Sequence, residues 1–151
     1  MTLRPAPADD AQALAGVHAR AFDHPWPAPD IAELIAAPGA FALAAERDAA
    51  VVGFILCRAI AGEAEILTLA IDPAARRSGL ARALVEAAAG LARVAGAEAM
   101  FLEVAEDNLP AISLYEGTGF VRAGLRRGYY ARGAGRAADA LVMRLELGRA
   151  A

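Results

Sequence analysis

Hydrophobic positions along the chain follow two periods, and each period predicts one kind of element. Apolar residues that recur every three or four positions are typical of amphipathic helices, and short alternating or continuous apolar runs are typical of strands. The helices expected from this pattern cover residues 9–22, 30–35, 79–95 and about 108–117. Asp9 or Asp10 is expected to cap the first helix, because a carboxylate there accepts hydrogen bonds from the first backbone N–H groups.

Seven strands are expected between and after these helices. Their ranges are 2–5, 41–45, 51–60, 63–72, 100–104, 120–130 and 138–147. Residues 46–48 are expected to turn the hairpin between the second and third strands, and Pro73 ends the fourth because it lacks a backbone N–H. With 151 residues, the chain has the length of one domain, 1–151. The order β-α-α-β-β-β-α-β-α-β-β predicts an α/β (α+β) fold around a mixed sheet.

The composition removes several classes of chemistry. All 15 basic residues are arginine, which excludes a Walker-type phosphate-binding lysine, a Schiff-base lysine and a pyridoxal anchor. The chain has two histidines, His18 and His24, and one cysteine, Cys57, so no cluster has the spacing of a zinc site. We expect no metal site, with Cys57 in the core, His18 on a helix surface and His24 in a turn.

Charge and hydropathy predict the compartment and the kind of partner. The net charge of −3 and the isoelectric point near 5.4 argue against a general nucleic-acid surface. No apolar run reaches the roughly 20 residues of a membrane span, and residues 1–30 carry acids and prolines where a signal peptide has a basic start and an apolar stretch. We therefore expect a cytoplasmic protein whose partner is neither nucleic acid nor membrane.

The strongest local signal lies in residues 71–82, between an expected strand and the longest helix. Small residues at positions 78, 79 and 81 let a ligand approach backbone N–H groups, and the helix start adds a positive dipole beside Arg76 and Arg77. This pattern predicts a pyrophosphate cradle. An ordinary strand-to-helix turn with glycine is the alternative, and the G-x-G-x-x-G spacing of a dinucleotide fingerprint is absent.

A second signal follows on the next helix. Asn108 and Tyr115 are seven residues apart, so they lie on one helix face about 10 Å apart along it. The stretch from Asn108 to Phe120 reads N-x-x-A-x-x-L-Y-x-x-x-G-F, and the cradle reads Arg76-x-x-Gly79-x-Ala81. Together, and in this order, the two stretches resemble motifs of the GNAT superfamily of N-acetyltransferases, with Ala81 where many members have glycine.

The resemblance extends over nearly the whole chain, which is similar to the RimI-type protein N-terminal acetyltransferases. The further stretches that carry it are His24-Pro25-Trp26, Leu102-Glu103-Val104, Arg126-Arg127-Gly128-Tyr129-Tyr130 and Asp139-Ala140-Leu141-Val142-Met143. The resemblance implies a GNAT fold, a mixed sheet splayed between its fourth and fifth strands with helices on both faces. It also implies acetyl transfer from acetyl-CoA to the N-terminal alanine of a protein, the eighteenth protein of the small ribosomal subunit.

The resemblance also implies which residues contact acetyl-CoA. Three residues at the end of the fourth strand would pair with the pantetheine arm like an added strand. Six residues of the cradle would surround the pyrophosphate, and one residue would contact the cofactor from the next helix. These ten residues are Leu69, Ala70 and Ile71, then Arg77, Ser78, Gly79, Leu80, Ala81 and Arg82, and finally Asn108.

Glu103 and Tyr115 are the candidate catalytic residues. Glu103 interrupts an apolar strand, and a carboxylate on a covered central strand must find a partner or line a cavity. Burial would raise its pKa and make it a better base, whereas a solvated strand face would leave it without a role. The resemblance implies that Glu103 deprotonates the incoming amine and that the Tyr115 hydroxyl protonates the departing thiolate. Without this resemblance, Tyr115 would be predicted to be an aromatic residue of the core.

Other residues and other functions stay open. Trp26 is either core or a substrate contact, and Arg126, Arg127, Tyr129 and Tyr130 either flank the substrate channel or form a solvated strand face. Acetylation of a small-molecule amine is one alternative function. A catalytically silent acyl-CoA-binding module is another, and its expected sign, loss of Glu103 or Tyr115, is not found.

Overall fold

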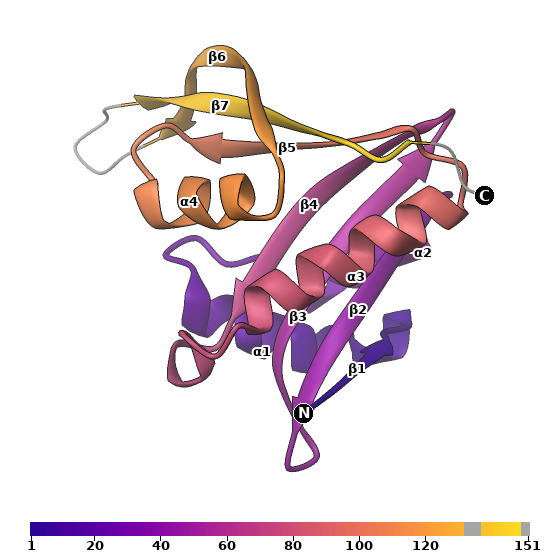
Figure 1. The fold of residues 1–151 in the computed structure, drawn as a ribbon. Coiled ribbons are helices and arrows are strands. Elements are labelled where there is room, and N and C mark those ends of the chain that lie inside the picture. The colour runs from indigo at the N-terminus through magenta and orange to yellow at the C-terminus, as the bar shows by residue number, and fades with distance from the viewer. Residues whose placement is uncertain (132–136, 149–151) are drawn as a thin grey trace.

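The structure is a computed structural model that describes residues 1–131 and 137–148, with side chains for 1–127 and 139–148. Seven strands form one mixed sheet in the order β1-β2-β3-β4-β5-β7-β6 (Figure 1). The strands are β1 Thr2–Pro5, β2 Ala40–Arg47, β3 Ala50–Ile60, β4 Glu63–Ile71, β5 Ala99–Ala105, β6 Val121–Ala131 and β7 Ala137–Glu146. The helices are α1 Ala11–Ala21, α2 Ala28–Ala36, α3 Leu80–Val94 and α4 Leu109–Gly117, with short 3-10 turns η1 Ala8–Asp10 and η2 Pro73–Ala75.

Helices cover both faces of the sheet, as expected. α1 and α2 pack on one face over a core that includes Leu14 and Phe54. α3 and α4 pack on the other face over a larger core that includes Leu84 and Met100. Successive residues of β3 alternate between the two cores, because side chains along a strand point to opposite faces. Burial on both faces explains why the sequence of β3 is a continuous apolar run.

The expected splay between the fourth and fifth strands is confirmed. β4 and β5 are parallel neighbours and pair only where Glu63–Glu65 face residues 99–101. Immediately beyond this point β4 has a bulge, because Ile66 pairs with Cys57 and Thr68 with Leu56, which leaves Leu67 without a partner on β3. Past the bulge the two strands diverge, and α3 and α4 lie on the same face on either side of the gap (Figure 1).

Two local expectations are wrong. The β2–β3 hairpin turns at Asp48 and Ala49, both with positive φ (52° and 63°), because β2 continues to Arg47, which pairs with Ala50. Asp10 does not cap α1 with its side chain, because its carboxylate accepts a hydrogen bond from Arg4 at 2.7 Å. α1 continues instead from the 3-10 turn η1.

Candidate active site

The open edge of β4 lies along the gap between β4 and β5. Leu69, Ala70 and Ile71 pair with β3 on one side, whereas the pairing with β5 ends at Glu65. Ala70 is buried toward α1, while Leu69 and Ile71 pack partly against the core under α3. These side chains fix the strand, and its second edge is left to face the gap. Such an edge can pair with an amide-containing chain in the way an added strand does.

The expected cradle lies where this edge meets the start of α3. Asp72 accepts a hydrogen bond from the Ala74 N–H at 3.0 Å, and the chain turns through η2 to Gly79. Gly79 has φ +77°, a left-handed conformation that glycine adopts without strain, and it provides no side-chain cap for α3. The first backbone hydrogen bond of the helix runs from the Ala83 N–H to the Gly79 carbonyl at 3.0 Å. The N–H groups of the three residues before Ala83 therefore precede the helical ladder, as an anion site requires.

The side chains of the cradle leave space for a ligand. Ser78 and Gly79 are exposed, and a Cβ added to Gly79 would meet nothing within 4 Å. Leu80 is buried and anchors the helix start in the core, and Ala81 is half-buried beside it. The hydroxyl of Ser78 donates to the Ala75 carbonyl at 2.6 Å, so it closes the turn.

Exposed guanidinium groups surround this helix start. Arg76, Arg77 and Arg82 are all exposed. Nε of Arg82 lies 3.4 Å from Oε1 of Glu86, one turn along the helix. Together with the helix dipole, they make the cradle positive. Arg20 on α1 holds the loop through an ion pair of 2.7 Å with Asp72. The hydrogen bond from Ala74 and this ion pair lower the pKa of Asp72, which keeps the carboxylate ionised.

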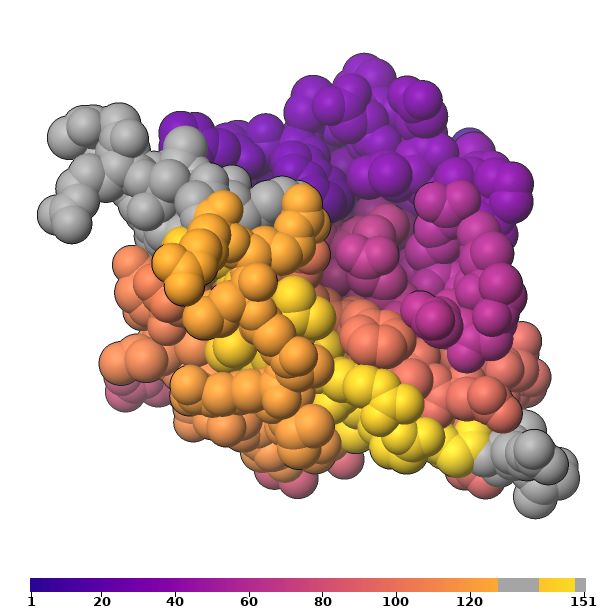
Figure 2. Space-filling model, turned by 90° about the horizontal axis from the view of Figure 1, so that it is seen from above, coloured from indigo at the N-terminus to yellow at the C-terminus, as the bar shows by residue number. Residues whose placement is uncertain are grey.

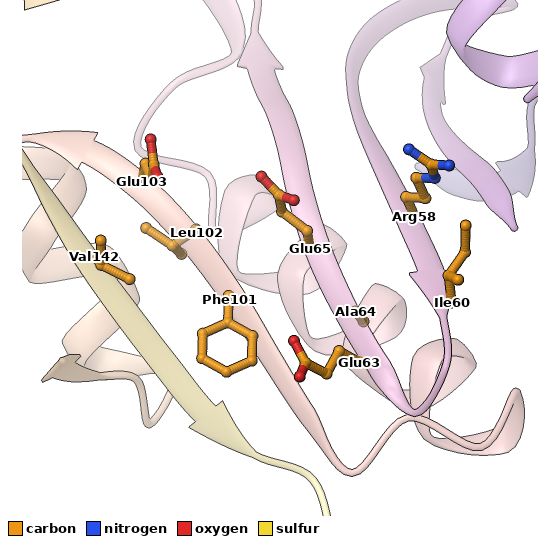
Figure 3. A pocket seen from close by; sticks show the side chains of 9 residues that line it. All are labelled: Arg58, Ile60, Glu63, Ala64, Glu65, Phe101, Leu102, Glu103 and Val142. Atoms are coloured by element: carbon orange, nitrogen blue, oxygen red, sulfur yellow. The ribbon is translucent and has the colours of Figure 1, made fainter. Parts of the chain in front are cut away.

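A cavity of about 440 Å³ opens near the same gap (Figure 3). Its lining comes from β3, β4, β5 and β7, and the residues are Arg58, Ile60, Glu63, Ala64, Glu65, Phe101, Leu102, Glu103 and Val142. In Figure 2, the orange and yellow end of the chain lies on one side and the magenta strands lie on the other, with salmon atoms between the yellow and the magenta. The lining runs from Arg58 to Val142, so the cavity combines residues that are far apart in the sequence.

Glu103 meets both conditions set by the sequence, because it lines this cavity and it has a partner. Arg126 on β6 donates a hydrogen bond from Nη1 to Glu103 Oε1 at 2.7 Å. The Glu103 side chain is 23% exposed, so solvent or a ligand can reach it. Arg127 is exposed, and the side chains of Tyr129 and Tyr130 lie outside the described part of the chain.

Glu65 is a charged residue of the cavity that the sequence reasoning missed. Its pKa is raised, first because the cavity wall removes water from the carboxylate and then because Glu103 faces it, while Arg58 and Arg126 oppose the shift. The alternation of residues 63–66 places Glu65 on one strand face, but only the pairing of Glu65 with Phe101 shows that this face turns toward Glu103.

Tyr115 and Asn108 do not share one exposed helix face. Tyr115 is 8% exposed and packs edge-to-face against Phe120, with ring centres 5.7 Å apart. Asn108 is exposed and caps α4, since its side-chain oxygen accepts a hydrogen bond from the Ala111 N–H at 3.3 Å. The contact with Phe120 therefore holds the Tyr115 ring in place, and Asn108 fixes the start of the helix that carries Tyr115.

His18 is not on a helix surface, and this expectation is wrong. Its ring is 2% exposed, and Nδ1 accepts a hydrogen bond from the Trp26 backbone N–H at 3.1 Å. Nε2 lies 3.2 Å from the Thr68 hydroxyl, so the neutral ring with a proton on Nε2 satisfies both contacts. The ring stacks on Phe22 and on half-buried Trp26, and burial lowers its pKa. His18 thereby ties the α1–α2 loop to β4.

Two smaller expectations concern reactive and metal-binding groups. Cys57 lies in the core, as expected, and burial raises the pKa of its thiol, so it stays protonated. Among residues 1–131 and 137–148, no three His, Cys, Asp or Glu side chains are grouped so that they could hold a metal ion. In the same ranges, no helix is both long enough and apolar enough to cross a membrane.

Comparisons with known proteins agree with the two motifs. Residues 11–120 match the acetyltransferase (GNAT) family. The N-alpha-acetyltransferase RimI of Mycobacterium tuberculosis is 37% identical over 145 residues, which cover 92% of this chain and 88% of that protein. The ribosomal protein bS18-alanine N-acetyltransferase of Escherichia coli is 38% identical over 94 residues, which cover 62% of this chain and 63% of that enzyme.

The crystal structure of the ribosomal-protein-S18-alanine N-acetyltransferase from Escherichia coli has the same fold. It superposes with a TM-score of 0.91 at 30% identity, and the match covers 99% of this chain and 96% of that one. The arrangement of strands and helices is therefore that of a known group of proteins. The chain belongs to the acetyltransferase (GNAT) family and, within it, to the RimI-type acetyltransferases.

Proposed function

We propose that the chain transfers an acetyl group from acetyl-CoA to the N-terminal α-amine of a protein that begins with alanine, and that this acceptor is ribosomal protein bS18. The observation that carries the proposal is the gap between β4 and β5. A positive helix start lies at one end of it, and a cavity lined by carboxylates, Glu103 among them, lies beside it. The relatives in Mycobacterium tuberculosis and Escherichia coli support the same reaction, because their names state N-terminal or alanine acetylation.

The open edge and the cradle fit acetyl-CoA. The N–H groups of Leu80, Ala81 and Arg82 and the guanidinium groups of Arg77 and Arg82 would hold the pyrophosphate, beside Ser78 and Gly79. The open edge formed by Leu69, Ala70 and Ile71 would pair with the amides of the pantetheine arm. When bound, acetyl-CoA supplies an activated thioester carbonyl and a thiolate leaving group. Asn108 would contact it from the start of α4, where its NH₂ group is not needed for capping.

Glu103 and Tyr115 would move the protons of the reaction. Glu103 accepts a proton from the acceptor nitrogen, directly or through water, and Arg126 holds its carboxylate in place at 2.7 Å. Tyr115 donates a proton to the sulfur, and its packing against Phe120 fixes the direction of the ring.

The physics of the amine favours an N-terminus over a lysine side chain. An α-amine titrates near pH 8 and a lysine amine near 10.4, so at pH 7 roughly a tenth of the former is neutral, against less than a thousandth of the latter. A site with carboxylate bases therefore has to deprotonate a smaller fraction of an α-amine than of a lysine amine. A ribosomal acceptor would place the protein in the cytoplasm, where ribosomes are assembled.

The test is a competition assay read by mass spectrometry. Peptides with the N-terminal sequence of bS18 after removal of Met are supplied in two forms, one with a free N-terminal Ala and an internal Lys and one with its N-terminus blocked. We expect acetylation of the free Ala amine to exceed that of the Lys side chain at least tenfold. Equal acetylation of the blocked peptide, or acetylation of a small polyamine alone, would contradict the proposal.

A further inference from the structure

The buried histidine of α1 holds the loop between α1 and α2. His18 is 2% exposed, and its Nδ1 accepts a hydrogen bond from the Trp26 backbone N–H at 3.1 Å. Its Nε2 lies 3.2 Å from the Thr68 hydroxyl on β4. Pro25 and Pro27 have no backbone N–H, so the loop can form few backbone hydrogen bonds of its own. The His18 ring therefore ties this loop to α1 and, through Thr68, to β4.

The loop carries an aromatic surface that is only partly buried. The His18 ring stacks on Phe22, with ring centres 4.3 Å apart, and on Trp26, with ring centres 5.0 Å apart. Phe22 is 42% exposed and Trp26 is half-buried. Aromatic rings of this kind can pack against a ligand, whereas the buried ring of His18 can act only through its two neighbours.

This aromatic surface borders the cavity of the candidate active site. Leu56 on β3 is the register partner of Thr68, and Arg58, two residues further along β3, is the partner of Glu65. Side chains two residues apart share one face of a strand, so Thr68 and Glu65 lie on the same face of β4, about 7 Å apart along it. The bulge in β4 allows this for residues that are three apart in the sequence. The side chain of His18, which contacts Thr68, is therefore next to the cavity that Glu65 lines.

The same face of the sheet is the one from which an acceptor would approach. In Figure 1, α3 lies in front of the strands and α1 lies behind them. Acetyl-CoA would bind at the start of α3, so the acceptor would reach the gap from the face of α1. Its amine would lie in the cavity beside Glu103, and its following residues would leave along this face. On the side of Thr68, the surface that they meet is that of Phe22 and Trp26.

We propose that His18 is a positioning residue for the acceptor, because it holds the backbone of Trp26 and so fixes the aromatic surface against which the acceptor residues after the first one bind. This assignment rests on the proposed function, since it concerns the peptide which that function acetylates. His18 itself touches neither the reacting atoms nor the acceptor. Its loss should therefore weaken acceptor binding and leave the chemical step unchanged.

The test compares two variants that each keep one half of the imidazole. The side-chain oxygen of asparagine takes nearly the place of Nδ1, whereas the carboxamide of glutamine reaches the place of Nε2. His18→Gln should lose the bond from Trp26 and raise KM for an Ala-initiated peptide about fivefold, the equivalent of about 1 kcal/mol. Its kcat, and its Kd for acetyl-CoA in calorimetry, should stay close to the wild-type values. His18→Asn should keep KM close to that of the wild type.

A minimal acceptor separates positioning from general damage to the fold. Alanine amide has the α-amine but no further residue that could reach Trp26, so its kcat/KM should be the same in the wild type and in His18→Gln. An equal loss with both acceptors would overturn the proposal. An unchanged KM for the peptide in His18→Gln would overturn it too, as would a folded His18→Asn that is impaired as much as His18→Gln.

A matched control lies in the same loop. His24 is exposed there, so His24→Gln makes the same exchange without removing the bond from Trp26. We expect the KM of His24→Gln for the peptide to equal that of the wild type. If His24→Gln raises KM as much as His18→Gln does, any change in the loop has this effect and the role of His18 fails.

The fluorescence of Trp26 tests the contact in the unaltered protein, because it is the only tryptophan of the chain. With CoA present, saturation with the Ala-initiated peptide should shift the emission of Trp26, and saturation with alanine amide should not. An emission that the peptide leaves unchanged would contradict the contact. This result would overturn the proposal even if the His18 variants failed to fold.

The same assays separate this proposal from the proposed function. If the wild type acetylates a lysine side chain or a polyamine but no N-terminus, the proposed function fails, and the variants measured with that amine still test His18. If His18→Gln matches the wild type on the Ala-initiated peptide, the role of His18 fails and the proposed function stands. A wild type that acetylates no amine overturns both.

Discussion

The cradle at the start of α3 and the cavity beside β5 differ in how the chain builds them. The cradle is one continuous segment, residues 71–82, in which a strand end, a turn and a helix start follow one another. The cavity takes its charged lining from β3, β4 and β5, and β6 supplies the guanidinium that pairs with Glu103; the β3–β4 hairpin, β5 and β6 are well separated in the sequence. A site made by one segment leaves a motif that can be read in the sequence, whereas a site made by several strands depends on their register.

The two regions also differ in charge, as their proposed ligands do. Arg76, Arg77 and Arg82 surround a helix start, which suits a pyrophosphate. The cavity presents carboxylates, which suit an ammonium group that has to lose protons. If this division holds, a change in one region should alter one ligand and leave the other nearly untouched.

The largest expected effect comes from the cavity. Glu103→Gln should lower turnover by roughly 10²–10⁴-fold while acetyl-CoA binds nearly as before, because the change removes a proton acceptor and leaves the cradle intact. Tyr115→Phe should behave alike, and the double variant should lose less than the product of the two losses. Steady-state kinetics and calorimetry measure the two quantities separately. Equal damage to turnover and to acetyl-CoA binding would indicate structural roles.

The second effect comes from the cradle. Gly79→Val should raise the Kd for acetyl-CoA at least tenfold, about 1.4 kcal/mol, because a side chain there occupies the space of the ligand and strains the turn. Gly96→Val is a matched control at the other end of α3, since Gly96 also has a positive φ (+95°) and open space around it. Equal Kd values in calorimetry for the two folded variants would contradict the binding of acetyl-CoA at the cradle.

The smallest effect concerns the link between the α1–α2 loop and β4. The pKa of His18 is lowered in the folded chain, so below the ordinary value near 6.5 the unfolded chain binds a proton that the folded chain does not. The contribution of His18 to the free energy of unfolding should therefore be fully present above about pH 6.5. It should be lost as the pH drops through the folded pKa, by about 1.4 kcal/mol for each pH unit by which the pKa is lowered.

Thermal melts at pH 7.5 and 5.5 measure this acid sensitivity. His18→Gln cannot titrate, so it should lose less stability on acidification than the wild type. The matched control is His24→Gln, because His24 is exposed in the turn before Trp26, and it should respond to acid as the wild type does. An unchanged acid response in His18→Gln would show that other groups titrate instead.

The sequence predicted well those features that depend on neighbouring residues. The order of all strands and helices, the end of β4 before Pro73 and the glycine at the start of α3 follow from local patterns. The splay and the family followed from the resemblance carried by the cradle and by the stretch from Asn108 to Phe120.

What the sequence missed depends on distant partners. The sequence pattern predicts that His18 is a surface residue of an amphipathic helix. Its burial is possible because Trp26 and Thr68 provide hydrogen-bond partners for both ring nitrogens. Glu65 reads as a polar residue of an alternating strand, and only the parallel pairing of β4 with β5 turns it toward Glu103. Asp10 reads as a helix cap, but Arg4 on β1 competes for its carboxylate.

The central claim is that the two regions meet at the gap between β4 and β5, with acetyl-CoA in the cradle and the acceptor amine in the cavity. A crystal structure with a bisubstrate analogue, in which CoA is joined to the N-terminal nitrogen of an Ala-initiated peptide, tests it most directly. The account predicts the pyrophosphate at the N–H groups of Leu80, Ala81 and Arg82, and the alanine nitrogen in the cavity beside the carboxylate of Glu103. A peptide bound away from this cavity, or a pyrophosphate away from the start of α3, would contradict it.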